Sequence, residues 1–172
     1  RYKLTSTDIV KLFGNYQGDT SCMIPQTTTT LSMKDADITS GVSYGDYGIA
    51  HLANLTTLTC SKTAAGPYFS WGNSNIEKVI VPKIGKDGAS GATIGYFHGM
   101  THLKEVDIST CAVGNVPASC FEGDINLSNV TIHSTNMTVI GASAFSGCTA
   151  LKNIIIPDGV TTLEDGAFGA SG

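Results

Sequence analysis

The stretch IGASAFSGCTALKNIIIPDGVTTLEDGAFG, residues 140–169, decides the fold because it contains the start of one motif twice. IGASAF at 140–145 begins again as LEDGAF at 163–168. A chain that restarts its own pattern is typical of a repeat protein, in which each repeat is one coil that stacks on its neighbours. The same pattern can be followed backwards through most of the sequence.

Apolar residues recur at fixed distances from an aromatic position. If Phe145 is position 0, then Cys148 is at +3, Leu151 at +6, Ile154 at +9 and Ile156 at +11. Earlier units keep these offsets with Phe121, Leu127, Val130 and Ile132; with Phe97, Met100, Leu103, Val106 and Ile108; with Ile76, Val79 and Val81; and with Ile49, Leu52, Leu55, Leu58 and Cys60. A weaker sixth unit supplies Leu31 and Met33, and Phe168 opens a seventh.

This spacing predicts one short strand in each unit. Residues at +9 and +11 point to one side of a strand, whereas those at +8 and +10 point to the other. One unit cannot bury its apolar side alone, but stacked units lay their strands in parallel about 4.8 Å apart and close a continuous core. The aromatic residue at position 0 is expected to fill the far side of each coil. We therefore predict a repeat solenoid with a parallel sheet of about six strands on one face.

Two segments resemble a known family. LKEVDISTCAV at 103–113 matches the frame of leucine-rich repeats, and AFSGCTALKNIIIPDGV at 144–160 is closer still to the BspA-like (Treponema-type) branch found in bacterial surface proteins. The resemblance covers about residues 28–172. It implies right-handed leucine-rich-repeat coils, with irregular or short helical turns on the face opposite the sheet. It also implies a cell-surface or secreted protein that adheres to host or neighbouring-cell proteins.

The middle repeats depart from the family pattern at two positions. Cys120 replaces the Ala that precedes the aromatic residue, and Asp124 stands where Cys148 stands in the last repeat.

The ends of the array suggest a domain division at residue 27. Residues 1–27 do not repeat, and Thr7 as N-cap with Gly14 as stop predicts a short helix that covers the first coil. Residues 28–172 form the repeat array, with an incomplete last repeat. We expect that the native protein continues beyond Gly172 or that this end packs against another molecule, including a second copy end to end.

Composition narrows the class of partner. A net charge of −4 and a pI near 5.4 argue against nucleic acid. No stretch approaches the ~18 apolar residues of a membrane span. The five cysteines are too irregularly spaced for a disulfide framework or a zinc site, and most take interior positions as small apolar side chains, whereas Cys22 has no assigned role.

No arrangement of residues predicts an enzyme, a cofactor or a metal site. Glu105 and Asp107 both point outward and in principle suit acid/base chemistry. However, Lys78 lies at the equivalent position of the neighbouring strand, so a cross-strand ion pair with Glu105 is the simpler interpretation. His98 and His102 lack a third metal ligand, and the Gly-rich loop at 85–95 lacks the Gly-Lys-Ser/Thr end of a phosphate-binding loop.

The outward positions of the sheet are the candidate binding site. We predict a noncatalytic module that binds an extracellular or host protein. The alternatives are a carbohydrate-recognition or accessory domain of a larger secreted protein, for which Tyr68 and Trp71 are the candidates, and a structural spacer. The sheet-face candidates are Lys78, Ile80, Glu105, Asp107, Asn129, Thr131, His133, Asn153 and Ile155.

Overall fold

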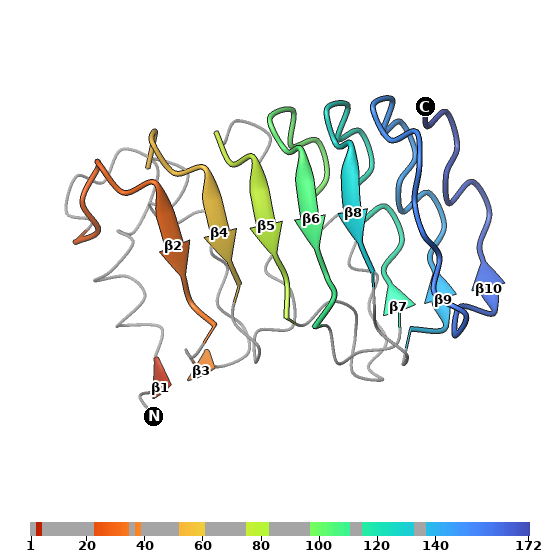
Figure 1. The fold of residues 1–172 in the computed structure, drawn as a ribbon, viewed down its shortest axis with the longest axis horizontal. Coiled ribbons are helices and arrows are strands. Elements are labelled where there is room, and N and C mark those ends of the chain that lie inside the picture. Colours follow the sequence, from red (N-terminus) through yellow and green to blue (C-terminus); the bar gives the residue numbers. More distant parts are fainter. Residues whose placement is uncertain are drawn as a thin grey trace.

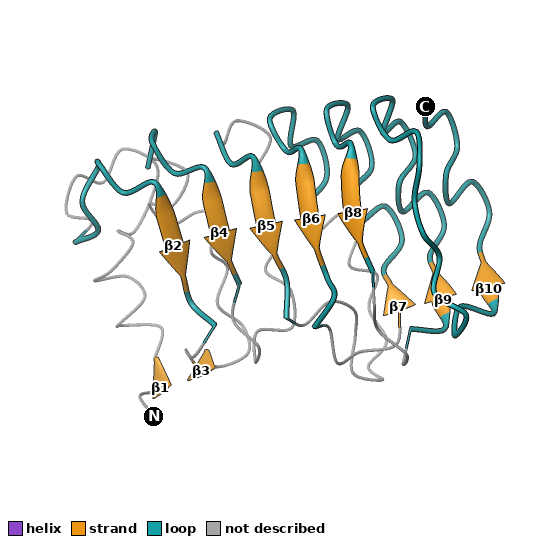
Figure 2. Cartoon of the chain, viewed as in Figure 1, coloured by secondary structure: helices purple, strands orange, loops and turns teal. Residues whose placement is uncertain are grey.

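Short strands of two or three residues carry the fold (Figures 1 and 2). The structure is a computed structural model that describes residues 3–4, 23–34, 37–38, 52–60, 75–82, 97–110, 115–132 and 137–172. Its strands are β1 (Lys3–Leu4), β2 (Thr30–Ser32), β3 (Asp37–Ile38), β4 (Thr57–Thr59), β5 (Lys78–Ile80), β6 (Glu105–Asp107), β7 (Asn115–Val116), β8 (Asn129–Thr131), β9 (Val139–Ile140) and β10 (Thr162–Leu163).

The main sheet has five strands in the order β2-β4-β5-β6-β8, and every neighbouring pair is parallel. Figure 1 shows these strands side by side along the molecule, in the order of the chain. Their register follows the repeat offsets, since Val79 of β5 pairs with Val106 of β6, and Val106 pairs with Val130 of β8. The extra residues between β5 and β6 therefore leave the register unchanged.

The residues predicted to face inward form the core. Leu103, Val106 and Ile108 are fully buried, and their equivalents in the neighbouring repeats are buried as well. Burial of one such side chain contributes about 1.5–3 kcal/mol, so each coil adds a similar amount of stabilisation. Burial is less complete at the two ends of the array, where Leu31 and Ile154 are only partly buried against the core.

A column of stacked phenylalanine rings fills the far side of the coils, as the position-0 pattern predicts. Phe97, Phe121, Phe145 and Phe168 lie one above another, with successive ring centroids 5.3–5.4 Å apart and nearly parallel planes. Backbone hydrogen bonds hold this side of the stack in place. Phe121 N donates to Ala144 O at 2.8 Å, and Phe145 N donates to Ala167 O at the same distance.

A second small sheet, not foreseen from the sequence, joins the return segments of the later coils. It contains β7, β9 and β10 in parallel order. The sequence signal was an apolar residue five positions before each Phe, at Val116, Ile140 and Leu163. Coils approach closely here, because a Cβ at Gly141 would lie 2.6 Å from Ala118 N and 2.8 Å from Val116 O.

The main sheet has five strands in the described residues, one fewer than the predicted number of about six. Residues 153–155, at the offsets of a sixth strand, form no strand. The apolar residues at +9 and +11 determine which side of a segment faces the core. They do not determine whether its backbone lies close enough to the neighbouring strand to pair with it. No helix occurs in the described residues, where turns connect the strands, and the helix predicted after Thr7 lies outside them. β1 pairs in parallel with β3 near the beginning of the chain.

Candidate binding face

Strands β4, β5 and β6 each bury the central side chain and leave the two flanking side chains half-exposed. These half-exposed positions form two columns across the outer surface of the sheet, which we call the sheet face. Its members are Thr30, Ser32, Thr57, Thr59, Lys78, Ile80, Glu105, Asp107, Asn129 and Thr131. Among the predicted site residues, the sheet brings together those of β5, β6 and β8.

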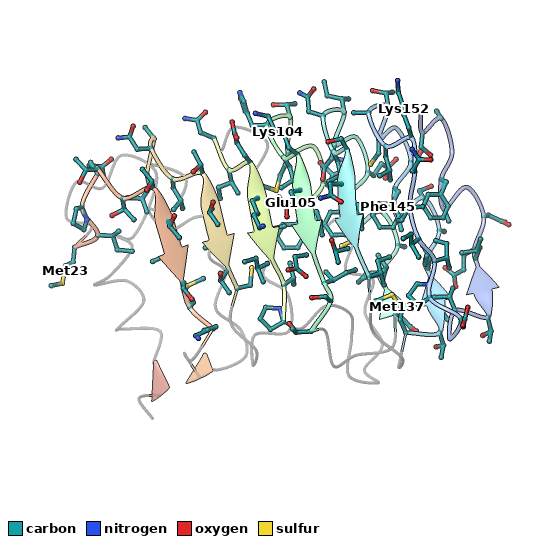
Figure 3. The ribbon with its side chains drawn as sticks, in the orientation of Figure 1. Met23, Lys104, Glu105, Met137, Phe145 and Lys152 are labelled. Carbon is teal, nitrogen blue, oxygen red and sulfur yellow. The ribbon has the colours of Figure 1, made fainter. Side chains whose placement is uncertain are left out.

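A pair of opposite charges lies at the centre of the sheet face. Lys78 Nζ lies 2.6 Å from Glu105 Oε1, which confirms the predicted cross-strand ion pair, and both side chains are about a third exposed. The hydrogen bond from Lys78 to Glu105 is the main cause that raises the pKa of the lysine, and the charges of Glu105 and Asp107 add to it. Figure 3 shows Glu105 on its strand in the middle of the sheet.

A second ion pair crosses the same two strands one residue earlier. Lys104 Nζ lies 2.8 Å from Glu77 Oε1, on more exposed side chains. Glu77 and Lys78 follow each other in the order Glu-Lys, whereas their partners Lys104 and Glu105 follow each other in the order Lys-Glu. Exposed pairs contribute at most about 1 kcal/mol each. Their stronger effect is on register, because a slip of one residue would place like charges opposite each other.

The rest of the sheet face is polar and uncharged, apart from Ile80 and Asp107. Hydroxyl groups from Thr30, Ser32, Thr57 and Thr59 occupy one side of the charged centre, and β8 adds an amide and a hydroxyl group on the other. Asp107 is held in place, because its Oδ1 accepts a hydrogen bond from Ser109 N at 2.9 Å. The side chains therefore suit hydrogen bonding with a polar surface.

Asn153 and Ile155 do not join this face as members of the sheet. They belong to the segment that fails to pair with β8, and Ile155 is 80% exposed. A groove of about 700 Å³ lies between this segment and β8. His133, Tyr68 and Trp71 lie outside the described residues. Their predicted roles stay predictions.

The ionisable groups with the most displaced pKa values are buried away from the sheet face. Burial raises the pKa of Asp124 to about 8, although its carboxylate accepts a hydrogen bond from Met100 N at 2.6 Å. Burial also raises the pKa of Cys148 to about 12, with a further contribution from the charge of Asp124, and burial alone raises that of Cys60 to about 12. These groups are buried in the core and are not part of the sheet face.

Asparagine side chains that the sequence did not single out connect successive coils. Asn54, Asn75 and Asn126 each precede the buried residue at +6, and each Nδ2 donates to a backbone carbonyl of the preceding coil at 2.6–2.8 Å. The recurring Asn-Leu or Asn-Ile dipeptide was the available signal. These residues support the coils rather than the sheet face.

Among the described residues, no three His, Cys, Asp or Glu side chains gather closely enough to hold a metal ion. His98 and His102 are both exposed and lie in turns. Within the same described ranges, no helix is long and apolar enough to cross a membrane.

Comparison with known proteins agrees with this architecture. The chain is similar to the crystal structure of a leucine-rich repeat protein from Eubacterium ventriosum, with a TM-score of 0.52 and 20% sequence identity over 84% of this chain. The match covers 43% of that protein, so this chain spans less than half its length. No curated protein matches the sequence.

The model of the BspA type leucine rich repeat region matches residues 67–172, in six copies. This range includes β5, β6 and β8, all three strands of the second sheet and the complete phenylalanine column. Repeat arrays of this kind generally serve as binding modules, since stacked coils present an extended regular surface. The chain belongs to the BspA-type leucine-rich repeat family.

Proposed function

We propose that this chain is a noncatalytic protein-binding module of a bacterial cell-surface or secreted protein, and that it adheres to an extracellular or host protein through the sheet face. The observation that carries the proposal is the sheet face itself. Its side chains are exposed or half-exposed and mostly polar, and two cross-strand ion pairs favour the observed register of β5 and β6. Such a surface can form many hydrogen bonds with a partner without a large ordering cost.

The predicted site residues take different parts in this proposal. Ile80 supplies an apolar contact at the centre of the face, beside the Lys78–Glu105 pair. Asn129 and Thr131 offer amide and hydroxyl groups at the margin formed by β8. Residues 28–172 are proposed as the binding array and residues 1–27 as its cap. His133 and the glycan candidates Tyr68 and Trp71 remain proposals from the sequence alone.

The test is binding of the purified chain to immobilised extracellular-matrix proteins, with glycans as a parallel set. Ile80→Arg places a long charged side chain in the middle of the sheet face, so we expect it to weaken saturable protein binding by at least about tenfold, which corresponds to about 1.4 kcal/mol. Ile80 is a better probe than Glu105, because a Glu105→Lys substitution would also leave Lys78 facing a like charge.

Ile125→Arg is the matched control. Ile125 is also an isoleucine with substantial exposure, but it lies in the turn that precedes β8 rather than on the sheet face. We expect it to bind like the unchanged chain. Equal loss in both variants, or no saturable binding to any protein, would contradict the proposed sheet-face function. Glycan binding that is lost on Trp71→Ala would favour the carbohydrate module instead.

Self-association is a second proposal, supported by the apolar surface of the last coil. Leu163 is 56% exposed there, and Phe168 has a stacked ring on one side. A second copy that stacked on this coil would cover these side chains. Sedimentation over a range of concentrations tests this, and a constant sedimentation coefficient for both the chain and Leu163→Glu would contradict it.

A further inference from the structure

The groove beside β8 interrupts an otherwise regular stack. Above it, Ala150 N donates to Ile125 O at 3.2 Å, and below it Thr162 N donates to Thr138 O at 3.1 Å. The last two coils are therefore connected on both sides of the groove, but they separate between these connections. The lining residues are Asn129, Val130, Thr131, Ile132, Lys152, Asn153, Ile154 and Ile155.

Backbone groups on both walls of the groove lack the partners that equivalent groups have elsewhere. In the preceding coils, Ile108 N donates to Thr131 O at 3.0 Å, and Asn129 N donates to Lys104 O at 3.1 Å. The equivalent bonds here would join Ile132 N to Ile155 O and Asn153 N to Ser128 O. Neither bond forms between these described residues. β8 thus presents the unpaired edge of a sheet, which is a template for another strand.

Lys152 supplies a charge at the start of the groove. It occupies the +7 position, where Lys104 occurs two coils earlier and pairs with Glu77 of the adjacent coil. The residue at +7 adjacent to Lys152 is Ser128, which has no charge. Lys152 is exposed and forms no ion pair with any carboxylate in the described residues. Figure 3 shows it projecting at the upper edge of the molecule.

We propose that this groove binds an extended peptide segment of a partner protein, which adds a strand beside β8 and places a carboxylate next to Lys152. The proposal rests on the proposed protein-binding function and names the chemical form of the partner at one margin of the sheet face. Strand addition gives affinity through backbone hydrogen bonds and specificity through alternate side chains. The volume lies within the range of about 300–1,000 Å³ for ligand sites.

The chain itself indicates which sequence would fit. β5 is preceded by Glu77, and its segment NIEKVIVP at 75–82 carries that glutamate at the position that would face Lys152. Within the fold, this same glutamate already pairs with a lysine at +7 of the adjacent coil. A peptide of this sequence, acetylated and amidated at its ends, is therefore a suitable probe.

The experiment titrates this peptide against the full chain by calorimetry or by fluorescence of a labelled peptide. We expect saturable binding at peptide concentrations up to about 1 mM, which is the weak end of specific association. Lys152→Glu should weaken binding by about fivefold, as for a partly exposed ion pair of up to about 1 kcal/mol. A peptide with Glu77→Lys should bind Lys152→Glu better than it binds the unchanged chain.

Lys34→Glu is the control, because it makes the same change of charge on an exposed lysine after β2, far along the array. It should bind the peptide normally. Absence of peptide binding, or equal weakening by Lys34→Glu and Lys152→Glu, would overturn the inference. If extracellular proteins bind the chain in an Ile80-dependent way and the peptide does not bind, the inference fails while the proposed function stands. If the peptide binds but no extracellular protein does, the result supports the inference about the groove and not the proposed function.

Discussion

At the scale of single residues, Asp124 is the most unusual side chain of the described core. It is fully buried, and it occupies the +3 position that Met100 and Cys148 fill in the neighbouring repeats. Its Oδ1 accepts a hydrogen bond from Met100 N at 2.6 Å, whereas Oδ2 has no partner. Burial without full hydrogen bonding disfavours the charged carboxylate, and the pKa rises to about 8.

This displaced pKa predicts that stability falls as pH rises. Between the ordinary value of 3.8 and about 8, the folded chain retains a proton that the unfolded chain has lost. The free energy of unfolding therefore decreases across this window and levels off above it. One pKa unit corresponds to about 1.4 kcal/mol, so a difference of about four units sets an upper limit of about 6 kcal/mol for the total decrease.

Asp124→Asn isolates this effect, because an amide retains the Oδ1 acceptor and cannot ionise. We expect the stability of this variant relative to the unchanged chain to increase between about pH 5 and about pH 9, measured by urea unfolding at each pH. A stability difference that stays constant over this range would show that Asp124 does not hold its proton in the fold.

The buried thiols should be unreactive in the folded chain. Cys60 and Cys148 have pKa values of about 12, and only the thiolate form is an effective nucleophile. We expect iodoacetamide at about pH 8 to label neither residue until denaturant is added. Peptide mass mapping checks this residue by residue. Rapid labelling of Cys148 without denaturant would mean that the last coils open readily.

At the scale of elements, the phenylalanine column should be most sensitive at positions with a ring on both sides. Phe145 lies between Phe121 and Phe168 and is fully buried, whereas Phe168 is partly buried and stacks on Phe145 alone among the described rings. We expect Phe145→Ala to lower the free energy of unfolding by about 3–5 kcal/mol. Phe168→Ala should cost clearly less. Chemical denaturation measures both, and equal losses would contradict stacking as the cause of the difference.

The sequence predicted those features of the fold that arise from side chains repeated at fixed positions in successive coils. The inward set of Leu103, Val106 and Ile108, the phenylalanine column and the Lys78–Glu105 pair all follow from fixed offsets within parallel coils. The unpaired segment at 153–155 was not predictable in this way, because its side chains keep the apolar pattern while its backbone does not reach β8. Pairing depends on the distance between two backbones, which a side-chain pattern does not report.

The same distinction applies to the candidate site. Outward positions on β5 and β6 could be assigned from alternation alone, since the strands pair in the expected register. The groove beside β8 could not be predicted from alternation, because it lies where the expected strand pairing does not form. Asn153 and Ile155 were therefore placed correctly along the repeat but wrongly as part of a continuous sheet.

At the scale of the whole molecule, each coil is stabilised by its contacts with the neighbouring coils. Neighbouring coils contact each other through strand pairing, ring stacking or asparagine side chains, and their apolar side chains form one core that runs along the array. In such an array, local opening should concentrate where one coil interface lacks some of these contacts. The interface between the coil of β8 and the coil of residues 152–155 meets this condition, because it retains ring stacking and the β9–β10 pairing but lacks strand pairing in the main sheet.

Hydrogen exchange of backbone amides measures this difference directly. Ile108 and Ile132 are equivalent residues with buried side chains, but Ile108 N donates to Thr131 O at 3.0 Å, whereas Ile132 N has no equivalent bond to Ile155. We therefore expect the Ile132 amide to exchange at least about tenfold faster than the Ile108 amide, a difference in protection of about 1.4 kcal/mol. Val81 N, which donates to Asp107 O at 2.8 Å, is the internal control and should resemble Ile108.

Equal protection of Ile108 and Ile132 would mean that residues 153–155 close onto β8 as a sixth strand in solution. In that case the groove would be occupied by the chain's own backbone, and an added peptide would have to compete with it.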